Sequence, residues 1–253
     1  MGSIYFAVFC VLLVFILVET YVYYLRPQQT RLKLNETLQY HPDWKRVKRT
    51  ERLFNALYRH VRGKAISSVT RRLRGIKSDE FVYGEIEFIS FFFILEKIKP
   101  QAGEIFYDLG SGTGKAVFAA ALGFDFSKAC GIELLPALYQ KAEAQRLQCK
   151  NLLLRQETAF TEVYLKKLAT VEFMNASFLE ADFSDADIVY VAATCLGEAT
   201  WGELIEKLAE LKIGSRIIVA TKTIQHEAFE LLESRAELMS WGLCRVNRYQ
   251  KIA

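Results

Sequence analysis

The fold of this 253-residue chain is decided by the stretch Phe106-Tyr107-Asp108-Leu109-Gly110-Ser111-Gly112-Thr113-Gly114-Lys115. Residues 104–107, which are mostly apolar and rich in aromatic and β-branched side chains, predict a short buried strand. The alanine-rich residues 116–122 predict the start of a helix. The glycines between them permit positive φ angles and let backbone N–H groups approach a ligand closely. The positive end of the helix dipole lies at the same place. The stretch therefore predicts a nucleotide-binding turn between a strand and a helix.

The spacing of the glycines excludes two common nucleotide motifs. A dinucleotide fingerprint, G-x-G-x-x-G, requires a third glycine where Lys115 stands. A Walker loop requires a hydroxyl residue after that lysine, and Ala116 stands there. What remains is Asp108 two residues before the pattern G-x-G-x-G, with a second acid, Glu133, closing the next predicted strand. The alternative is a glycine turn that binds no ligand.

The acidic residue and the three glycines resemble motif I of the class I S-adenosylmethionine-dependent methyltransferases. The resemblance implies a Rossmann-like, doubly wound α/β fold with a seven-stranded sheet, and S-adenosyl-L-methionine as the cofactor. It also implies that the glycine loop wraps the amino-acid end of the cofactor, while Glu133 holds the ribose hydroxyls. The order of the remaining elements agrees, since helices and strands alternate. We expect helices at 88–98, 136–150 and 201–211, strands at 129–133, 171–174, 187–191 and 216–221, and a terminal hairpin formed by 238–241 and 244–249.

A second resemblance is more specific. The segment Val82-Tyr83-Gly84-Glu85, the apolar helix after it and the glycine loop follow the order of the non-SET histone-lysine methyltransferases of the disruptor-of-telomeric-silencing family. The resemblance covers residues 80–222. It implies that the Tyr83-Gly84-Glu85 loop covers the cofactor and shapes a channel for a substrate lysine. Thr194 and Cys195 then form the opposite wall of that channel.

Several positions depart from that second family. Its acid before Phe-Leu, its glutamine after the glycine loop, its threonine after Tyr-Gly-Glu and its asparagine segment are all replaced. The replacing residues are Ser177, Lys115, Ile86 and Ala192-Ala193-Thr194. Cofactor binding depends on the backbone loop and Glu133 and is unaffected, whereas lysine specificity does not follow from these residues. A broader set of relatives of undetermined substrate has Ser-Thr-Cys where this chain has Ala193-Thr194-Cys195.

These arguments define the predicted site. The predicted cofactor-binding residues are Tyr83, Glu85, Asp108, Gly110, Ser111, Gly112, Gly114, Lys115, Glu133, Ser177, Phe178 and Ala193. The predicted catalytic residues are Tyr83, Glu85, Thr194 and Cys195. Methyl transfer from a sulfonium needs alignment and desolvation, and a narrow apolar channel lowers the pKa of a substrate amine. We predict no metal site, because the acids at positions 182, 185 and 187 have no histidine to support them.

The N-terminal residues predict a membrane anchor. An apolar run from Ile4 to Val18 continues, after Glu19 and Thr20, to Leu25, which is about the length that a membrane-spanning helix needs. Basic residues follow this segment, so the positive-inside rule places the rest of the chain in the cytoplasm. The five scattered cysteines, without a C-x-x-C pair, also favour a reduced compartment. The alternative is a cleaved signal peptide, although the basic start of such a peptide is missing.

The next segment is strongly basic. Residues 26–80 carry 15 Lys and Arg but only 5 Asp and Glu, whereas residues 81–253 carry 18 against 23. We expect a polar linker at 27–40 and then an amphipathic helix from Asp43 to Val61. Anionic lipid headgroups are one partner for this basic neck. A solvated helix packed on the catalytic domain is an equal alternative, and nucleic acid ranks third.

The sequence therefore predicts a three-part monomer. The parts are a transmembrane anchor at 1–25, a basic linker and helical neck at 26–78, and a class I methyltransferase domain at 79–253. The predicted function is a membrane-anchored, single-pass, S-adenosylmethionine-dependent methyltransferase that acts on a protein lysine. One alternative is methylation of a lipid or small molecule. Another is a cofactor-binding module without catalytic activity.

Overall fold

The computed structural model describes residues 11–14, 16–73, 84–155 and 160–253. Most of the glycine-loop domain lies within these ranges. Part of the expected anchor, residues 1–10 and 15, lies outside the described residues, and so does Tyr83. Within the described ranges, no helix combines the length and the apolar character that a membrane crossing requires.

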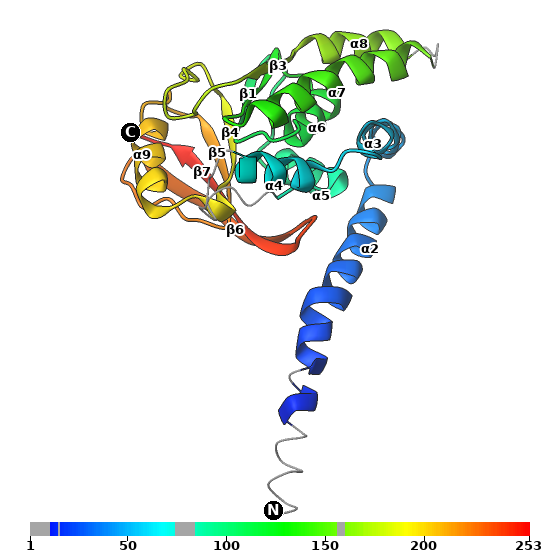
Figure 1. Cartoon of the computed structure of the whole chain (residues 1–253), viewed down its shortest axis with the longest axis vertical. Helices are drawn as coiled ribbons and strands as arrows, with labels where there is room; N and C mark the ends of the chain where they lie inside the picture. Colours follow the sequence, from blue (N-terminus) through cyan, green and yellow to red (C-terminus); the bar gives the residue numbers. More distant parts are fainter. Residues whose placement is uncertain (1–10, 15, 74–83, 156–159) are drawn as a thin grey trace, which may run out of the picture.

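The N-terminal segment is helical and leads away from the domain. A π-helical turn, η1 (Tyr21–Leu25), passes into helix α2 (Arg26–Gln39), whose N-terminal end lies farther from the sheet than its C-terminal end (Figure 1). The expected linker at 27–40 is therefore wrong. Glutamine, arginine, leucine and lysine favour helix, and Pro27 occupies the first turn, where proline is tolerated. Leu38, near the C-terminal end of α2, is fully buried in the hydrophobic core.

The basic neck packs on the domain. Helix α3 (Trp44–Tyr58), which confirms the amphipathic helix expected there, joins the same hydrophobic core as the helices beside the sheet. Its buried hydrophobic side chains are Val47, Leu53, Phe54, Leu57 and Tyr58. Buried Gln145 ties the end of α3 to the domain by donating to the Leu57 carbonyl at 2.6 Å. Helix α4 (Gly63–Leu73) follows. The boundaries at 25 and 78 stay predictions.

A seven-stranded sheet forms the centre of the molecule, which confirms the predicted fold class. Its strand order is β3-β2-β1-β4-β5-β7-β6. The first five strands in that order are parallel, and β7 pairs antiparallel with both β5 and β6. The strands are β1 (Ile105–Leu109), β2 (Lys128–Ile132), β3 (Val171–Met174), β4 (Ile188–Ala192), β5 (Arg216–Ala220), β6 (Phe229–Met239) and β7 (Gly242–Lys251).

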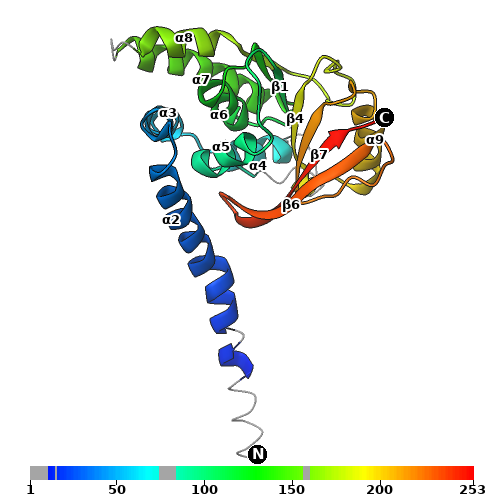
Figure 2. The same cartoon turned by 180° about the vertical axis from the view of Figure 1, so that it is seen from behind.

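Alternating residues of the central strands enter two separate cores. Ile188 and Tyr190 belong to the core that the neck shares, whereas Val189 and Val191 belong to the other. The first core is covered by α5 (Phe88–Glu96), α6 (Lys115–Gly123), α7 (Pro136–Leu154) and α8 (Thr161–Ala169). The second is covered by α9 (Glu198–Leu208). Figures 1 and 2 show these helices on opposite sides of the sheet.

Several element boundaries differ from the prediction; helix α9, for example, spans Glu198–Leu208 instead of 201–211. Helix α7 continues to Leu154 instead of ending at residue 150. The terminal hairpin exists, but its first strand runs over 229–239, and Ser240 and Trp241 form its turn with Gly242 at a φ of 120°. Strand β6 is an edge strand whose exposed residues include both charged and apolar side chains, with Leu231 and Leu232 exposed side by side. The apolar alternation that identifies a strand is therefore weak there.

Candidate active site

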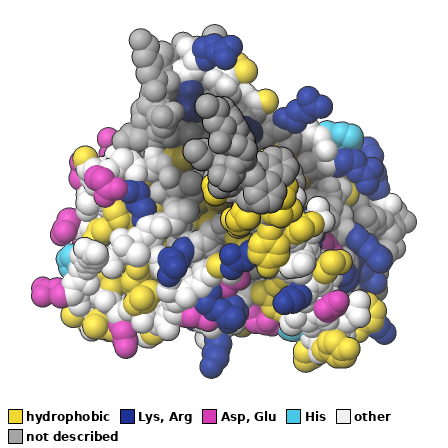
Figure 3. Space-filling view, turned by 90° about the horizontal axis from the view of Figure 1, so that it is seen from below, with side chains coloured by type: hydrophobic (Ala, Val, Ile, Leu, Met, Phe, Trp, Pro, Cys, Tyr) yellow, Lys and Arg dark blue, Asp and Glu magenta, His cyan; other side chains and the backbone are white. Residues whose placement is uncertain are grey.

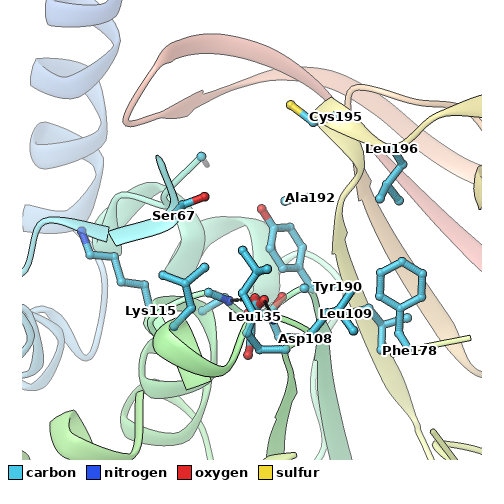
Figure 4. A pocket seen from close by; sticks show the side chains of 18 of the residues that line it. Ser67, Asp108, Leu109, Lys115, Leu135, Phe178, Tyr190, Ala192, Cys195 and Leu196 are labelled. Carbon is cyan, nitrogen blue, oxygen red and sulfur yellow. Dashed lines mark hydrogen bonds between the residues drawn. The ribbon is translucent and has the colours of Figure 1, made fainter. Parts of the chain in front are cut away.

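A cavity of about 310 Å³ lies at the carboxyl ends of β1, β2 and β4, where open parallel sheets bind ligands (Figure 4). The glycine loop after β1 and the end of β2 form its floor. The loop at 177–179 and the 3₁₀ turn η3 (Ala193–Cys195) form its side. Helix α4, residues 84–86, Leu138 of α7 and Thr200 of α9 also line it.

The glycine loop is folded tightly against β2. The Gly110 and Ser111 N–H groups both donate to the Ile132 carbonyl, at 2.8 and 3.0 Å. Gly114 caps α6 with a φ of 82°, and a Cβ atom there would lie 2.5 Å from the Phe173 ring. Only glycine fits this position, because the conformation is left-handed and the space is already filled. The loop therefore presents backbone N–H groups to the cavity at the start of a helix.

Glu133 holds this loop in place from the end of β2. Its carboxylate accepts hydrogen bonds from the Gly112 N–H at 2.8 Å and from the Leu135 N–H at 2.7 Å. The side chain lies in the cavity wall and is only 7% exposed. Burial raises its pKa, although the two backbone donors act in the opposite direction. Glu133 can thus support the loop and face a ligand at the same time.

Asp108 is the second buried carboxyl group of the cavity. Burial raises the pKa of Asp108 well above its ordinary value, and the neighbouring charge of Glu133 raises it further. Two carboxylates in one buried site repel each other unless a positive charge lies between them. The cavity therefore favours a ligand that carries positive charge near Asp108.

Three polar atoms in the cavity wall lack hydrogen-bond partners. Among the described residues, the buried side-chain atoms without a partner include Glu85 Oε1, Ser111 Oγ and the Tyr190 hydroxyl. Buried polar groups are normally paired, so atoms left unpaired in a cavity indicate where a ligand binds. Tyr190 stands opposite Asp108 in the β1–β4 register, and its ring packs edge-on against Phe91 at 4.9 Å.

The 84–86 loop closes one side of the cavity. Glu85 accepts a hydrogen bond from Lys115 Nζ at 2.5 Å, which links the loop to the first residue of α6. The Glu85 carbonyl accepts from the Ser240 N–H at 3.1 Å, and Ile86 bridges to Met239, so the hairpin turn supports the loop from outside. Figure 4 shows Lys115 across the cavity from Phe178. Sequence reasoning did not predict the contact between Lys115 and Glu85.

The structure brings most of the predicted site residues together. The predicted residues that line the cavity are Glu85, Asp108, Gly110, Ser111, Gly112, Lys115, Glu133, Ser177, Phe178 and Cys195. Gly114, at the end of the loop, faces Phe173 and does not line the cavity, and Ala193 is buried in the core. Thr194 is exposed and does not line the cavity. Among the described residues, no group of three His, Cys, Asp or Glu side chains is placed to hold a metal ion.

Other site residues were missed. Tyr58 at the end of α3 donates from its hydroxyl to the Thr113 carbonyl in the glycine loop at 2.9 Å, and Ser67 of α4 lines the cavity. No local motif marks either residue, because their contacts are made only in the folded chain. Tyr190 could have been found, since it is a polar side chain in an otherwise apolar strand next to the β1 acid.

Comparison with known proteins identifies the family. The family described as "Histone methylation protein DOT1" matches residues 64–250, which is more than half of the chain. The chain belongs to the DOT1 family. The predicted resemblance is therefore confirmed, as are the class I methyltransferase domain and S-adenosyl-L-methionine as its cofactor.

The DOT1 relatives are longer than this chain. The protein of Cryptococcus neoformans named "Histone-lysine N-methyltransferase, H3 lysine-79 specific" is 29% identical over 169 residues, which cover 65% of this chain and 25% of the relative. The protein of the same name from Debaryomyces hansenii is 34% identical over 125 residues, which cover 48% of this chain and 10% of the relative. The chain thus spans a quarter or less of these relatives' length.

A solved structure supports the fold of this DOT1-family chain. The putative RNA methyltransferase from Pyrococcus horikoshii superposes with a TM-score of 0.51 at 12% sequence identity. The match covers 81% of this chain and all of the other. At this identity the likeness concerns the fold alone.

Proposed function

We propose that this chain is an S-adenosylmethionine-dependent methyltransferase that modifies a lysine side chain of a protein, with histone H3 as the first substrate to test. The observation that carries the proposal is the cavity, in which the glycine loop, two buried carboxyl groups and three unpartnered polar atoms meet. Membership of the DOT1 family and the names of the two relatives support lysine as the acceptor.

The residues of the cavity fit the cofactor. Asp108 and the loop N–H groups would hold its charged amino-acid end, and Glu133 its ribose hydroxyls. The unpartnered Ser111 hydroxyl supplies a further polar contact. Apolar side chains suited to the flat adenine ring line the wall, namely Leu134, Leu135, Leu138, Phe178 and Leu179. When bound, the cofactor supplies an electrophilic methyl group on a sulfonium.

The protein's own contribution is alignment and desolvation. Tyr190 and Cys195 lie on the side of the cavity next to the end of β4. A lysine amine must be neutral to attack, and an apolar channel disfavours its charged form. Glu85 places an unpartnered carboxylate oxygen in the cavity, where it can accept a hydrogen bond from the amine and orient it. Such alignment accounts for much of the catalysis of a displacement reaction.

We also propose that residues 4–25 anchor the chain in a membrane, with the domain on the cytoplasmic side. The apolar run in the sequence supports this proposal. The large apolar side chains described at 11–25 are exposed, from 41% at Val22 to 68% at Val11. Figure 3 shows a group of hydrophobic side chains near the middle of this face, with Lys and Arg side chains around it. Release of the full chain from membranes by alkaline carbonate without detergent would contradict the anchor.

Transfer of a labelled methyl group tests the substrate class. The full chain in detergent is incubated with methyl-labelled S-adenosylmethionine, whole-cell lysate and membranes. We expect label in protein, and in purified histone H3, as acid-stable methyl-lysine. Label confined to the organic extract would assign a lipid or small molecule instead. No transfer to any fraction, with cofactor binding intact, would contradict the enzymatic proposal.

Glu133→Ala tests the cofactor assignment. We expect the variant to bind S-adenosylmethionine about 10- to 100-fold more weakly in a calorimetric titration, because hydrogen bonds to a charged group are lost and the loop N–H groups lose their acceptor. Glu180→Ala is the control, since this exposed acid follows the 177–179 loop without lining the cavity. Parental affinity in Glu133→Ala would rule out the ribose assignment.

A further inference from the structure

A second cavity, of about 440 Å³, lies beside the cofactor cavity. Its walls come from α2, α3, the N-terminal end of α5 and the hairpin turn. Ile86 and Lys115 line both cavities, so the two are separated by little more than these side chains. The methyl-transfer site does not account for this second cavity.

The N-terminal turn of α5 lines the second cavity. Residues 87–90 form this part of the wall, and Glu87, the N-cap residue, makes no side-chain capping bond. The first intrahelical bond runs from the Phe91 N–H to the Glu87 carbonyl at 2.9 Å. The N–H groups of residues 88–90 precede that bond, and such groups attract anions together with the helix dipole.

Ser90 provides an independent sign of a ligand. The residue is 1% exposed, and its Oγ has no hydrogen-bond partner among the described residues. Ser90 is the third residue of α5, and helical side chains lean toward the N-terminus of their helix. Its hydroxyl is therefore directed toward the turn that lines the cavity. Because buried hydroxyl groups are normally hydrogen-bonded, the free Ser90 hydroxyl indicates a hydrogen bond to a bound ligand.

The charges around the second cavity favour an anion. Its two acids are already paired, Glu87 with Arg31 at 2.5 Å and Glu51 with Lys48 at 2.9 Å. Arg59 lies on the rim, is exposed and forms no ion pair with any described residue. Arg59 and the helix N-terminus thus leave the cavity with an unneutralised positive potential.

We propose that the second cavity binds a phosphate monoester. A phosphate group offers several strong acceptor oxygens, which match the Ser90 hydroxyl, the first-turn N–H groups of α5 and the Arg59 guanidinium together. The phosphate can come from a lipid headgroup or from a soluble ester, since both present the same group to these donors.

Titration with phosphate compounds tests this site. The full chain in detergent is titrated calorimetrically with inorganic phosphate, glycerol 3-phosphate and a short-chain phosphatidic acid below its micelle concentration. Arg59→Ala and Ser90→Ala are each expected to weaken binding about tenfold, the effect of losing one hydrogen bond to a charged group. Arg52→Ala, an exposed arginine of α3 outside the cavity, is the matched control and should change binding less than about twofold.

Thermal unfolding first shows that each variant is folded, and the binding data then support or overturn the phosphate site. Absence of saturable binding in the parent chain would overturn the proposal, and so would equal losses in Arg52→Ala and Arg59→Ala. A loss in Arg59→Ala without one in Ser90→Ala would contradict a site at the α5 N-terminus. Tighter binding of phosphatidic acid than of glycerol 3-phosphate supports the site with a headgroup as its source, and equal binding supports it with a soluble ester.

Discussion

Asp108→Asn is expected to raise the thermal stability of the cofactor-free chain while weakening S-adenosylmethionine binding about a hundredfold or more. The carboxyl group is 3% exposed and lies near Glu133, so its ionised form is costly without a cation. Asparagine keeps the shape and removes the charge. The affinity falls because removing a buried charge that pairs with a cationic ligand costs about 2–5 kcal/mol of binding free energy.

The stability gain of Asp108→Asn should depend on pH. The pKa of Asp108 is raised in the folded chain, so the folded state holds its proton more tightly than the unfolded chain does. The ionisation penalty is therefore absent below the ordinary carboxyl pKa of about 4, and it develops as pH rises toward the raised pKa. Melting curves of parent and variant should separate as pH rises and converge in acid.

Asp182→Asn is the control for this experiment. Its carboxyl group is exposed, and the Ser184 N–H lowers its pKa, the opposite direction to Asp108. We expect unchanged cofactor affinity and no gain in stability. If Asp108→Asn melts below the parent at neutral pH, or retains the parent's affinity, the role given to Asp108 is wrong.

Gly114→Ala is expected to destabilise the domain by about 2–5 kcal/mol, because left-handed strain and a steric clash act together. The φ angle is 82°, and the added methyl carbon would lie 2.5 Å from Phe173 Cζ. Moving that ring would disturb β3 and the loop that binds the cofactor. Urea unfolding followed by circular dichroism measures the effect, and weaker cofactor binding should accompany it.

Alanine substitutions at two other glycines distinguish backbone strain from steric clash as the cause of the destabilisation in Gly114→Ala. Gly103 has a φ of 88° but nothing within 4 Å of an added Cβ, so Gly103→Ala reports backbone strain alone. Gly202 lies inside α9 with open space around it, so Gly202→Ala should stabilise the chain by about 1 kcal/mol. A Gly114→Ala variant no less stable than Gly103→Ala would show that the clash with Phe173 has no cost.

The parts of the site that depend on local spacing could be predicted from the sequence. The glycine pattern, Asp108 and Glu133 are defined by a strand, a turn and the next parallel strand, and this geometry varies little. The residue of the η3 turn that faces the cavity could not be predicted. A shift of the turn by one residue decides whether Thr194 or Cys195 lines the cavity, and the sequence does not determine that shift. The Lys115–Glu85 contact was also missed, since it joins segments 30 residues apart.

In the helical neck, too, the local helix could be predicted but its contacts with distant segments could not. Its amphipathic pattern predicted α3, but no pattern could show which surface the apolar face would meet. Helix α2 was mistaken for a linker because most of its residues are polar. Its buried residues are Pro27 and Leu38, which are too few and too far apart to give an apolar periodicity.

The hydrogen bond from Tyr58 to the glycine loop affects where this chain can be truncated. The matched family region begins at residue 64, and the predicted methyltransferase domain begins at residue 79. Tyr58 and the buried face of α3 lie before both points. A truncation at either place would open the core beside α5 and α6 and remove a support of the loop. A soluble fragment for crystallisation or assay should therefore start ahead of Leu38, and sequence alignment alone would place that start too late.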